Sequence, residues 1–404
     1  MTQPSLYAAT PPSSRPESGP PLALYVHIPF CHVRCTYCAF NVYTKRERLI
    51  APYMAALRRE IALAASDKRR PALSVYFGGG TPSLVPADEI AATLDACRAA
   101  FALQPAAEIT LELNPESGDE AYLLALRHAG VNRLSIGMQS AHAEELKLYA
   151  RPHTLDDVRR AIRRARAAGF ENISLDLIYG SPRQTLSMWQ DSLRAALALE
   201  PEHISFYGLS IEEGTTFERW ARSGRIAEPD PDLAADMYEW ATDELVTAGF
   251  EQYEISNWAR PGAESRHNLQ YWRCEPYLGL GAGAHGYANG VRYDTALRPE
   301  AYIARIDGQR APQAFPLTAA VEHVEAIDQP TAMAEWMIMG LRLVRDGIDP
   351  EEFRARFGVS LASIYASEIE PLRAAGLLDS GKDGRLRLTR RGRLLGNQVF
   401  LAFI

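Results

Sequence analysis

Six short apolar segments recur along the first half of the chain, and segments with helical periodicity separate them. The apolar segments predict strands at residues 22–28, 73–77, 108–113, 131–137, 172–178 and 202–207. The segments between them predict helices near residues 49–66, 86–103, 118–129, 155–168 and 186–198. Strands that alternate with helices form a parallel sheet, because right-handed crossovers wind the chain in one direction. We therefore expect an α/β fold whose first part, about residues 22–215, is a partial, TIM-like (βα)6 barrel.

The rest of the chain follows a different pattern. A helix is expected at residues 231–248, and a Trp- and Gly-rich stretch at 253–290 extends the barrel. Helical segments near 331–345, 349–356 and 360–375 precede a hairpin-like segment at 381–388, an order that resembles a winged helix. The expected division is a disordered, Pro- and Ser-rich lead-in over residues 1–21, the barrel with its extension over 22–290, and a smaller, mainly helical, winged-helix-like domain over 291–404.

Composition excludes several classes of partner. The formal net charge is −7, so the surface as a whole does not attract nucleic acid, and the arginine-rich face at residues 159–166 is expected to be solvated. No run of 18 apolar residues predicts a transmembrane helix, while a peripheral contact with a membrane stays open. The first residues lack the basic-then-apolar order of a signal peptide, which indicates a cytoplasmic location. There, clustered cysteines indicate metal or redox chemistry rather than disulfides.

Glycines and polar side chains gather where the expected strands end. A cysteine-rich loop follows the first strand, residues 78–82 (GGGTP) follow the second, and residues 114–115 (NP) follow the third. Gln139 follows the fourth strand, and Asp176 lies in the last turn of the fifth. Because the carboxyl ends of parallel strands meet at one edge of the barrel, we expect the reactive site at that rim.

The cysteine-rich loop carries Cys31, Cys35 and Cys38 with the spacing C-x3-C-x2-C. Three thiolates can hold three irons of a [4Fe–4S] cube and leave the fourth iron open to a small molecule. A zinc site usually has four protein ligands, and no fourth cysteine follows locally. A zinc knuckle that borrows His27 or His32 is the alternative.

This spacing resembles the hallmark of the radical S-adenosylmethionine (SAM) superfamily. The resemblance implies that the open iron binds the amino and carboxylate groups of SAM, and that one electron from the cluster cleaves the sulfonium. It also implies an electron donor to the cluster as a partner. By analogy, and with Tyr37 as a candidate to stack on adenine, the expected SAM-binding residues are Tyr25, Tyr37, Gly79, Gly80, Thr81, Glu112, Gln139, Arg151 and Asp176.

Three longer motifs narrow the resemblance. Residues 25–31 read YVHIPFC, residues 77–82 read FGGGTP, and residues 176–180 read DLIYG. They resemble the HemN/HemW branch, which contains the oxygen-independent coproporphyrinogen III oxidases and the haem chaperones related to them. The oxidase pattern has a further cysteine two residues after the third, where this chain has Phe40, and a longer extension before its first strand. Both features indicate the chaperone group.

Residues 267–272 read HNLQYW and match the H-N-x-x-Y-W motif of the haem-binding relatives. Imidazole is a common axial ligand of haem iron, and aromatic rings offer flat apolar faces. A packing cluster of the same side chains is the alternative. The resemblance implies a chaperone that passes haem to acceptor haemoproteins, with His267, Tyr271 and Trp272 as haem contacts. Coproporphyrinogen III oxidation, or another radical SAM reaction on a tetrapyrrole, is the enzymatic alternative.

The cysteine spacing yields the first prediction. Anaerobically reconstituted protein should hold about four irons per chain, because three thiolates suffice to hold one cube. Replacing Cys31, Cys35 and Cys38 together by Ser should abolish that iron, as measured by iron analysis and by the spectrum of the reduced cluster. Iron content that is the same in the triple variant would show that these cysteines are not the ligands.

Overall fold

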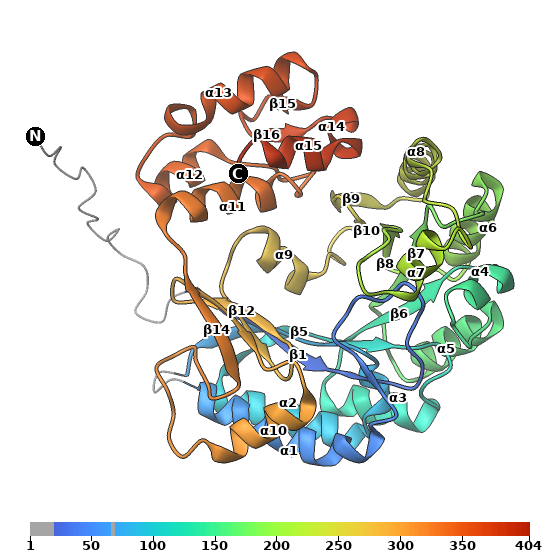
Figure 1. The fold of residues 1–404 in the computed structure, drawn as a ribbon, viewed down its shortest axis with the longest axis vertical. Helices are drawn as coiled ribbons and strands as arrows, with labels where there is room; N and C mark the ends of the chain where they lie inside the picture. The colour runs from blue at the N-terminus through green and yellow to red at the C-terminus, as the bar shows by residue number, and fades with distance from the viewer. Residues whose placement is uncertain (1–19, 66–68) are drawn as a thin grey trace, which may run out of the picture.

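The computed structural model describes residues 20–65 and 69–404 (Figure 1). Most of the expected lead-in, residues 1–19, lies outside the described residues. Six parallel strands form the middle of a twelve-stranded sheet, in the order β1-β4-β5-β6-β7-β8. They are β1 (Leu22–Ile28), β4 (Pro71–Gly79), β5 (Ala102–Leu113), β6 (Arg133–Gln139), β7 (Ile173–Tyr179) and β8 (His203–Gly208). The expected (βα)6 unit is confirmed.

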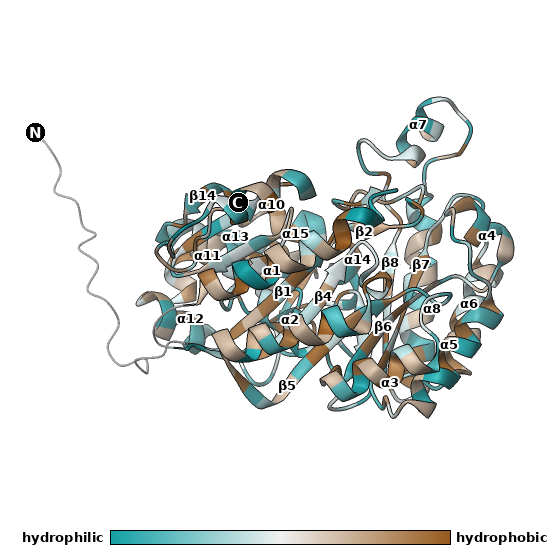
Figure 2. Cartoon of the chain, turned by 90° about the horizontal axis from the view of Figure 1, so that it is seen from below, coloured by the Kyte–Doolittle hydropathy of each residue, from teal (hydrophilic) through white to brown (hydrophobic). Residues whose placement is uncertain are grey.

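Crossover helices cover the outside of this curved sheet (Figure 1). They are α1 (Ile50–Ala64), α2 (Ala87–Ala100), α3 (Glu120–Ala129), α5 (Leu155–Ala167) and α6 (Leu186–Leu197). Each helix buries one apolar stripe, which in α5 contains Val158 and Ile162. On the opposite face of α5, Arg159 and Arg160 form ion pairs with acidic residues one turn earlier. Figure 2 shows that outer face of α5 as hydrophilic. The arginine-rich face is therefore solvated, as expected.

Short strands extend the sheet beyond both edges of the barrel. Beyond β1 lie β11 (Tyr277–Leu280), β12 (His285–Ala288), β13 (Val291–Thr295) and β14 (Val321–Ala326), and beyond β8 lie β10 (Asn257–Ala259) and β9 (Glu251–Glu254). The sequence pattern missed these strands because they have three to six residues each and no regular alternation with helices. β13 and β14 belong to this sheet although they lie after residue 290, where we expected the second domain to begin. The barrel stays open, since β1 and β8 each pair with an extension strand.

The two faces of the six-stranded unit have opposite character. On the outer face lie buried apolar residues that pack against the helices, among them Leu24, Val75, Leu111, Leu134, Leu175 and Ile204. On the inner face, residues in register with one another are polar: Tyr25, Tyr76, Thr110 and Arg133 form one row across four strands. Parallel strands are usually apolar on both faces. A polar inner face therefore identifies the lumen as a chamber built for a ligand.

The last part of the chain forms a second, smaller unit with its own apolar core, which includes Met337, Leu341, Ile348 and Phe353. Its elements are α11 (Gln329–Gly340), α12 (Pro350–Phe357), α13 (Leu361–Ala374), β15 (Leu378–Ser380), β16 (Leu386–Leu388), α14 (Arg390–Leu394) and α15 (Gly396–Leu401). β15 and β16 pair as an antiparallel hairpin after the helices. The expected helical unit with a two-stranded wing is confirmed.

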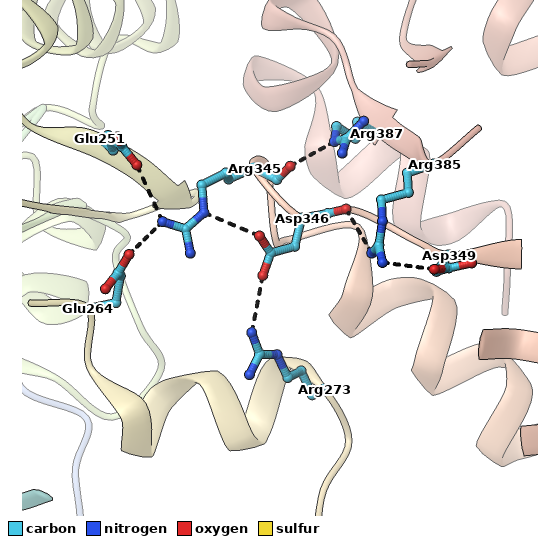
Figure 3. Close-up of polar contacts among 8 residues, drawn as sticks. All are labelled: Glu251, Glu264, Arg273, Arg345, Asp346, Asp349, Arg385 and Arg387. Carbon is cyan, nitrogen blue, oxygen red and sulfur yellow. Dashed lines mark hydrogen bonds and ion pairs between the residues drawn. The ribbon is translucent and has the colours of Figure 1, made fainter. Parts of the chain in front are cut away.

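An ion-pair network joins the two units (Figure 3). Arg345 of the smaller unit contacts Glu264 and lies 3.4 Å from Glu251, both on the extension of the barrel. Arg345 also contacts the neighbouring Asp346 at 3.2 Å. The carboxylate of Asp346 accepts a hydrogen bond at 3.1 Å from Arg273, which lies at the end of the helix that follows β10. These partly exposed charges link the winged unit to the barrel in one orientation. None of the described helices has the length and apolar composition to cross a membrane.

Candidate functional site

A cavity of about 580 Å³ opens at the carboxyl ends of the six strands and reaches down into the lumen. This size lies within the range of about 300–1,000 Å³ that is typical of small-molecule and cofactor sites. Loops after β1, β4 and β5 line its rim as the sequence predicts, as do Gln139 at the end of β6 and Asp176 within β7. The loop after β8 also lines it, which the sequence pattern did not predict. The expected site residues that line it are Cys31, Cys35, Tyr37, Cys38, Gly79, Gly80, Thr81, Glu112, Gln139, Arg151 and Asp176. Tyr25, His267, Tyr271 and Trp272 are not among the lining residues.

The cysteine loop is attached to the glycine loop by backbone hydrogen bonds. The N–H of Gly80 donates to the carbonyl of Ile28 at 2.8 Å, and the N–H of Thr81 donates to the carbonyl of Phe30, also at 2.8 Å. This approach leaves no room for a side chain at Gly80, because a Cβ atom there would lie 2.6 Å from the Phe30 oxygen and 3.0 Å from the Cys31 sulfur. The hydroxyl of Thr81 lies 3.5 Å from the same sulfur. The two loops therefore form one unit.

The three thiols share this rim, and they lie close enough to one another to affect the pKa values of Cys31 and Cys38. Burial raises the pKa of Cys31 to about 11, and the nearby thiols of Cys38 and Cys35 contribute to the rise. Burial, and then the proximity of Cys35, also raises the pKa of Cys38. The guanidinium of Arg151 lies 3.7 Å from the Cys35 sulfur and offsets part of this repulsion. Three thiols with a hydroxyl and a guanidinium beside them fit an iron–sulfur cluster, whose irons hold the thiolates deprotonated.

The alternative zinc site lacks its histidine. The ring nitrogens of His27 are both engaged, with the hydroxyl of Tyr25 at 3.0 Å and with the carbonyl of Asn41 at 3.0 Å. His32 is exposed and lies 3.5 Å from Glu47. Over residues 20–65 and 69–404, no three histidine, cysteine or acidic side chains converge as ligands of a single metal ion.

Glu112 stands beneath the glycine loop. Its carboxylate accepts hydrogen bonds from the N–H of Gly79 at 3.1 Å and from the hydroxyl of Tyr76 at 3.0 Å. Burial, together with the negative charge of Asp176, raises the pKa of Glu112 to about 7. Gly79 has a φ of 115°, which favours glycine. The carboxylate is thus held toward the space where the resemblance places SAM.

Gln139 and Arg151 lie side by side above Gly137. Arg151 donates to the Gly137 carbonyl at 2.9 Å, and a Cβ atom on Gly137 would lie 2.6 Å from Arg151 and 2.8 Å from the Gln139 amide. Gln139 itself has a φ of 63°, a left-handed conformation that costs energy for a residue other than glycine. Strained backbone of this kind clusters at ligand sites. Both side chains therefore meet at the rim because Gly137 leaves them space.

The lower lumen contains Asp176, which the sequence predicts as a site residue, and further polar residues that it did not single out. Asp176 accepts from the hydroxyl of Ser135 at 2.9 Å, and burial raises the pKa of this carboxylate. Further residues line the cavity at this level or near it, namely Tyr76, Arg133, Ser205, Tyr207 and Asn268. The period of two along a strand would have found most of them, because every second residue points into the lumen.

The HNLQYW segment forms α9 (Arg266–Trp272), whose first turn lies against β4 and β5. Glu108 of β5 accepts the N–H groups of Arg266 and His267, each at 3.0 Å. The imidazole of His267 is buried between the hydroxyls of Ser74 at 2.9 Å and Tyr271 at 2.7 Å. Both ring nitrogens are therefore engaged inside the fold, and α9 closes the lumen at the end opposite the cysteines.

This environment keeps the His267 ring neutral. Burial, with a smaller contribution from the positive charge of Arg133, lowers the pKa of His267 to about 3. The ring of Tyr271 packs edge-on against Tyr277, with centroids 4.6 Å apart, and the Arg342 guanidinium lies over the Trp272 ring at 4.5 Å. A neutral imidazole can ligate iron, but a haem iron reaches it here only after one of its two hydrogen bonds breaks.

Comparison with known proteins agrees with this geometry. The family model of the radical SAM superfamily matches residues 25–196, and that of the HemN C-terminal domain matches residues 327–395. The chain is 38% identical to a protein of Mycobacterium tuberculosis named "Heme chaperone HemW", over 96% of each chain. A protein of Bacillus subtilis with the same name is 37% identical, over 94% of this chain and 98% of that one.

Among solved structures, coproporphyrinogen III oxidase (HemN) from Escherichia coli superposes on this chain with a TM-score of 0.79. The match covers 95% of this chain and 90% of the oxidase chain, and the two sequences are 24% identical. That likeness shows a shared fold. The open barrel and its cysteine rim are those of a radical SAM protein, a class that implies SAM and an iron–sulfur cluster as cofactors. Full-length similarity of 35–38% to proteins named HemW shows that the chain belongs to the HemW family.

The close contact at Gly80 yields a prediction. Gly80→Ala should push the cysteine loop away from the glycine loop, because its methyl group meets backbone atoms of Phe30 that cannot rotate aside. We expect a destabilisation of about 1–3 kcal/mol and a loss of at least half of the reconstituted iron. The matched control is Gly308→Ala, since a Cβ atom at Gly308 meets nothing within 4 Å. Equal iron content in both variants would contradict the role given to this contact.

Proposed function

We propose that this protein is a haem chaperone, which binds haem and passes it to acceptor haemoproteins while carrying a SAM-binding [4Fe–4S] cluster. The observation that carries the proposal is similarity over nearly the whole chain to several proteins named "Heme chaperone HemW". The reducing cytoplasm, expected from the cysteine content and the first residues, is the proposed location. An electron donor to the cluster is a further proposed partner.

Each part of the rim has a role in this proposal. Cys31, Cys35 and Cys38 hold the cluster, and the backbone at Gly79 and Gly80, both of which line the cavity, receives the amino-acid part of SAM. When bound, the cluster and SAM together supply one-electron chemistry at the sulfonium. Side chains deeper in the cavity, Glu112 and Asp176 among them, are placed to accept hydrogen bonds from the ribose, and Tyr37 lines the cavity where it can contact the adenine.

The mouth of the cavity differs from the oxidase pattern. Phe40 stands where that pattern has its further cysteine, lines the cavity, and exposes 68% of its surface. Val33, 49% exposed on the same loop, adds to this apolar lip. An exposed apolar lip beside a deep cavity suits a flat, largely apolar ligand such as haem. The likeness to the oxidase structure supports the fold and does not extend to its reaction.

The function is tested by two assays on anaerobically reconstituted protein. Haem-loaded protein should restore the activity of an apo-peroxidase faster than the same amount of haem held by serum albumin. With SAM and a reductant, it should form no protoporphyrinogen from coproporphyrinogen III, because Phe40 replaces the oxidase cysteine. Conversion of coproporphyrinogen III would instead support the oxidase alternative, and failure to bind haem would reject the chaperone.

We also propose that His267, Tyr271 and Trp272 take part in binding haem, with His267 as the axial ligand once its ring is released. Tyr271→Phe removes the hydroxyl that is hydrogen-bonded to the Nε2 atom of His267. Haem iron then no longer has to break this hydrogen bond, so the affinity for haem should rise about 2- to 10-fold, which corresponds to the free energy of one hydrogen bond. His267→Ala should shift the Soret band and weaken binding.

The matched control is Tyr277→Phe, which removes a hydroxyl from the ring next to Tyr271 and leaves the hydrogen bonds of His267 in place. Cluster iron is measured in every variant to confirm that the barrel is intact. A Soret position and haem affinity that do not change in His267→Ala would show that His267 is not the ligand.

A further inference from the structure

Arg133 is a buried cation without a counter-charge. It is the first residue of β6, exposes 2% of its surface, and lines the cavity. Its Nε atom is buried and has no hydrogen-bond acceptor. In the part of the chain that the structure describes, no carboxylate lies within ion-pair distance of its guanidinium. A buried charge is costly unless a partner compensates it, so a missing partner points to a ligand.

The carboxylates that border the lumen are already engaged elsewhere. Asp176 accepts two serine hydroxyls, at 2.9 and 3.4 Å. Glu112 accepts a tyrosine hydroxyl and a backbone N–H, and Glu108 accepts donors from the first turn of α9. Their charges act on the lumen from a distance, and none of them forms a salt bridge with Arg133. The guanidinium therefore keeps its hydrogen-bonding capacity for an acceptor that the fold does not provide.

A second buried polar group without a partner lies beside it. Thr110 on β5 is the register neighbour of Arg133, and its hydroxyl is fully buried with no hydrogen-bond partner. A guanidinium presents a planar fork that matches a carboxylate, and a hydroxyl can donate to the same group. Arg133 lines the cavity and the Thr110 hydroxyl is buried on the adjacent strand, so these two unsatisfied donors mark a subsite for an oxyanion at Arg133.

We propose that Arg133 binds a carboxylate of the ligand, namely a propionate of haem; this inference rests on the proposed function. SAM also carries a carboxylate, but its amino-acid part belongs at the rim, beside Gly79 and Arg151. Arg133 lies in the same row across the sheet as Tyr76, three residues before Gly79, so this row stands about 10 Å below the glycine loop at the rise of a strand. We therefore assign the anion at Arg133 to haem, and the affinity for SAM distinguishes the two carboxylates.

The test compares haem with haem dimethyl ester, which lacks the two charged carboxylates, in one detergent-containing buffer. Wild-type protein should bind haem at least 10-fold more tightly than the ester. In Arg133→Met this preference should fall to 2-fold or less, with the affinity for the ester changed by no more than 2-fold. Arg133→Lys keeps the charge without the planar fork and should give an intermediate preference. Arg159→Met, which removes an exposed arginine of α5, should behave like wild type.

Stability and SAM affinity provide the second readout. Removing an unpaired buried charge should leave the cluster iron unchanged and the melting temperature of Arg133→Met no lower than that of wild type. A lower melting temperature with an unchanged preference for haem would show a structural role and overturn the proposal. A 10-fold loss of SAM affinity with that preference intact would assign the carboxylate to SAM instead. Wild-type protein that binds no haem would refute the chaperone function and the subsite together, whereas a preference that persists in Arg133→Met refutes the subsite alone.

Discussion

The backbone contact between the cysteine loop and the glycine loop is the interaction on which the site depends. β1 and β4 pair in parallel up to Ile28 and Gly79, and the hydrogen bonds from Gly80 and Thr81 continue that pairing into the loops. The sulfur atoms and the surface for an amino-acid ligand therefore occupy fixed positions relative to each other. This arrangement requires the absence of a side chain at Gly80, so a residue without functional groups of its own determines the geometry of the whole rim.

The polar lumen is the second constraint, because it must be stable without a ligand and still bind one. Most of its groups satisfy each other: His267 lies between two hydroxyls, and Glu108 caps the first turn of α9. The exceptions include the hydroxyl of Thr110 and the Nε atoms of Arg133 and, nearer the rim, Arg151. In a core built for stability alone, such groups would be paired or apolar. The position of Arg133 in the cavity lining is explained if the ligand completes the network.

Much of the fold could be predicted from the sequence, because the alternation of strands and helices is strong and local. The six parallel strands and the rim they form followed from this alternation and from the position of the cysteines. The extension strands could not be predicted in the same way: β10 has three residues, and its role becomes visible only when it pairs with β8. Residues 291–326 were likewise expected in the smaller domain, and only the pairing of β13 with β12 and of β14 with β13 places them in the sheet.

The site was predicted less evenly than the fold. The spacing of Cys31, Cys35 and Cys38 indicated a cluster site. Because these cysteines directly follow the first predicted strand, their position also placed that site at the carboxyl ends of the strands. The HNLQYW segment identified a family but not a location, because nothing in six letters shows that His267 faces Ser74. Arg133 was overlooked for a physical reason: its importance lies in the partner it lacks, and a missing partner is visible only after the chain has folded.

The most direct test of this account is an anaerobic crystal structure of the reconstituted protein with SAM, in which iron is located by its anomalous scattering. We expect one compact group of four irons, three of them bound to the sulfurs of Cys31, Cys35 and Cys38, with the amino-acid part of SAM against the backbone of Gly79 and Gly80. Iron bound away from these sulfurs, or SAM bound outside the cavity at the carboxyl ends of the strands, would contradict it.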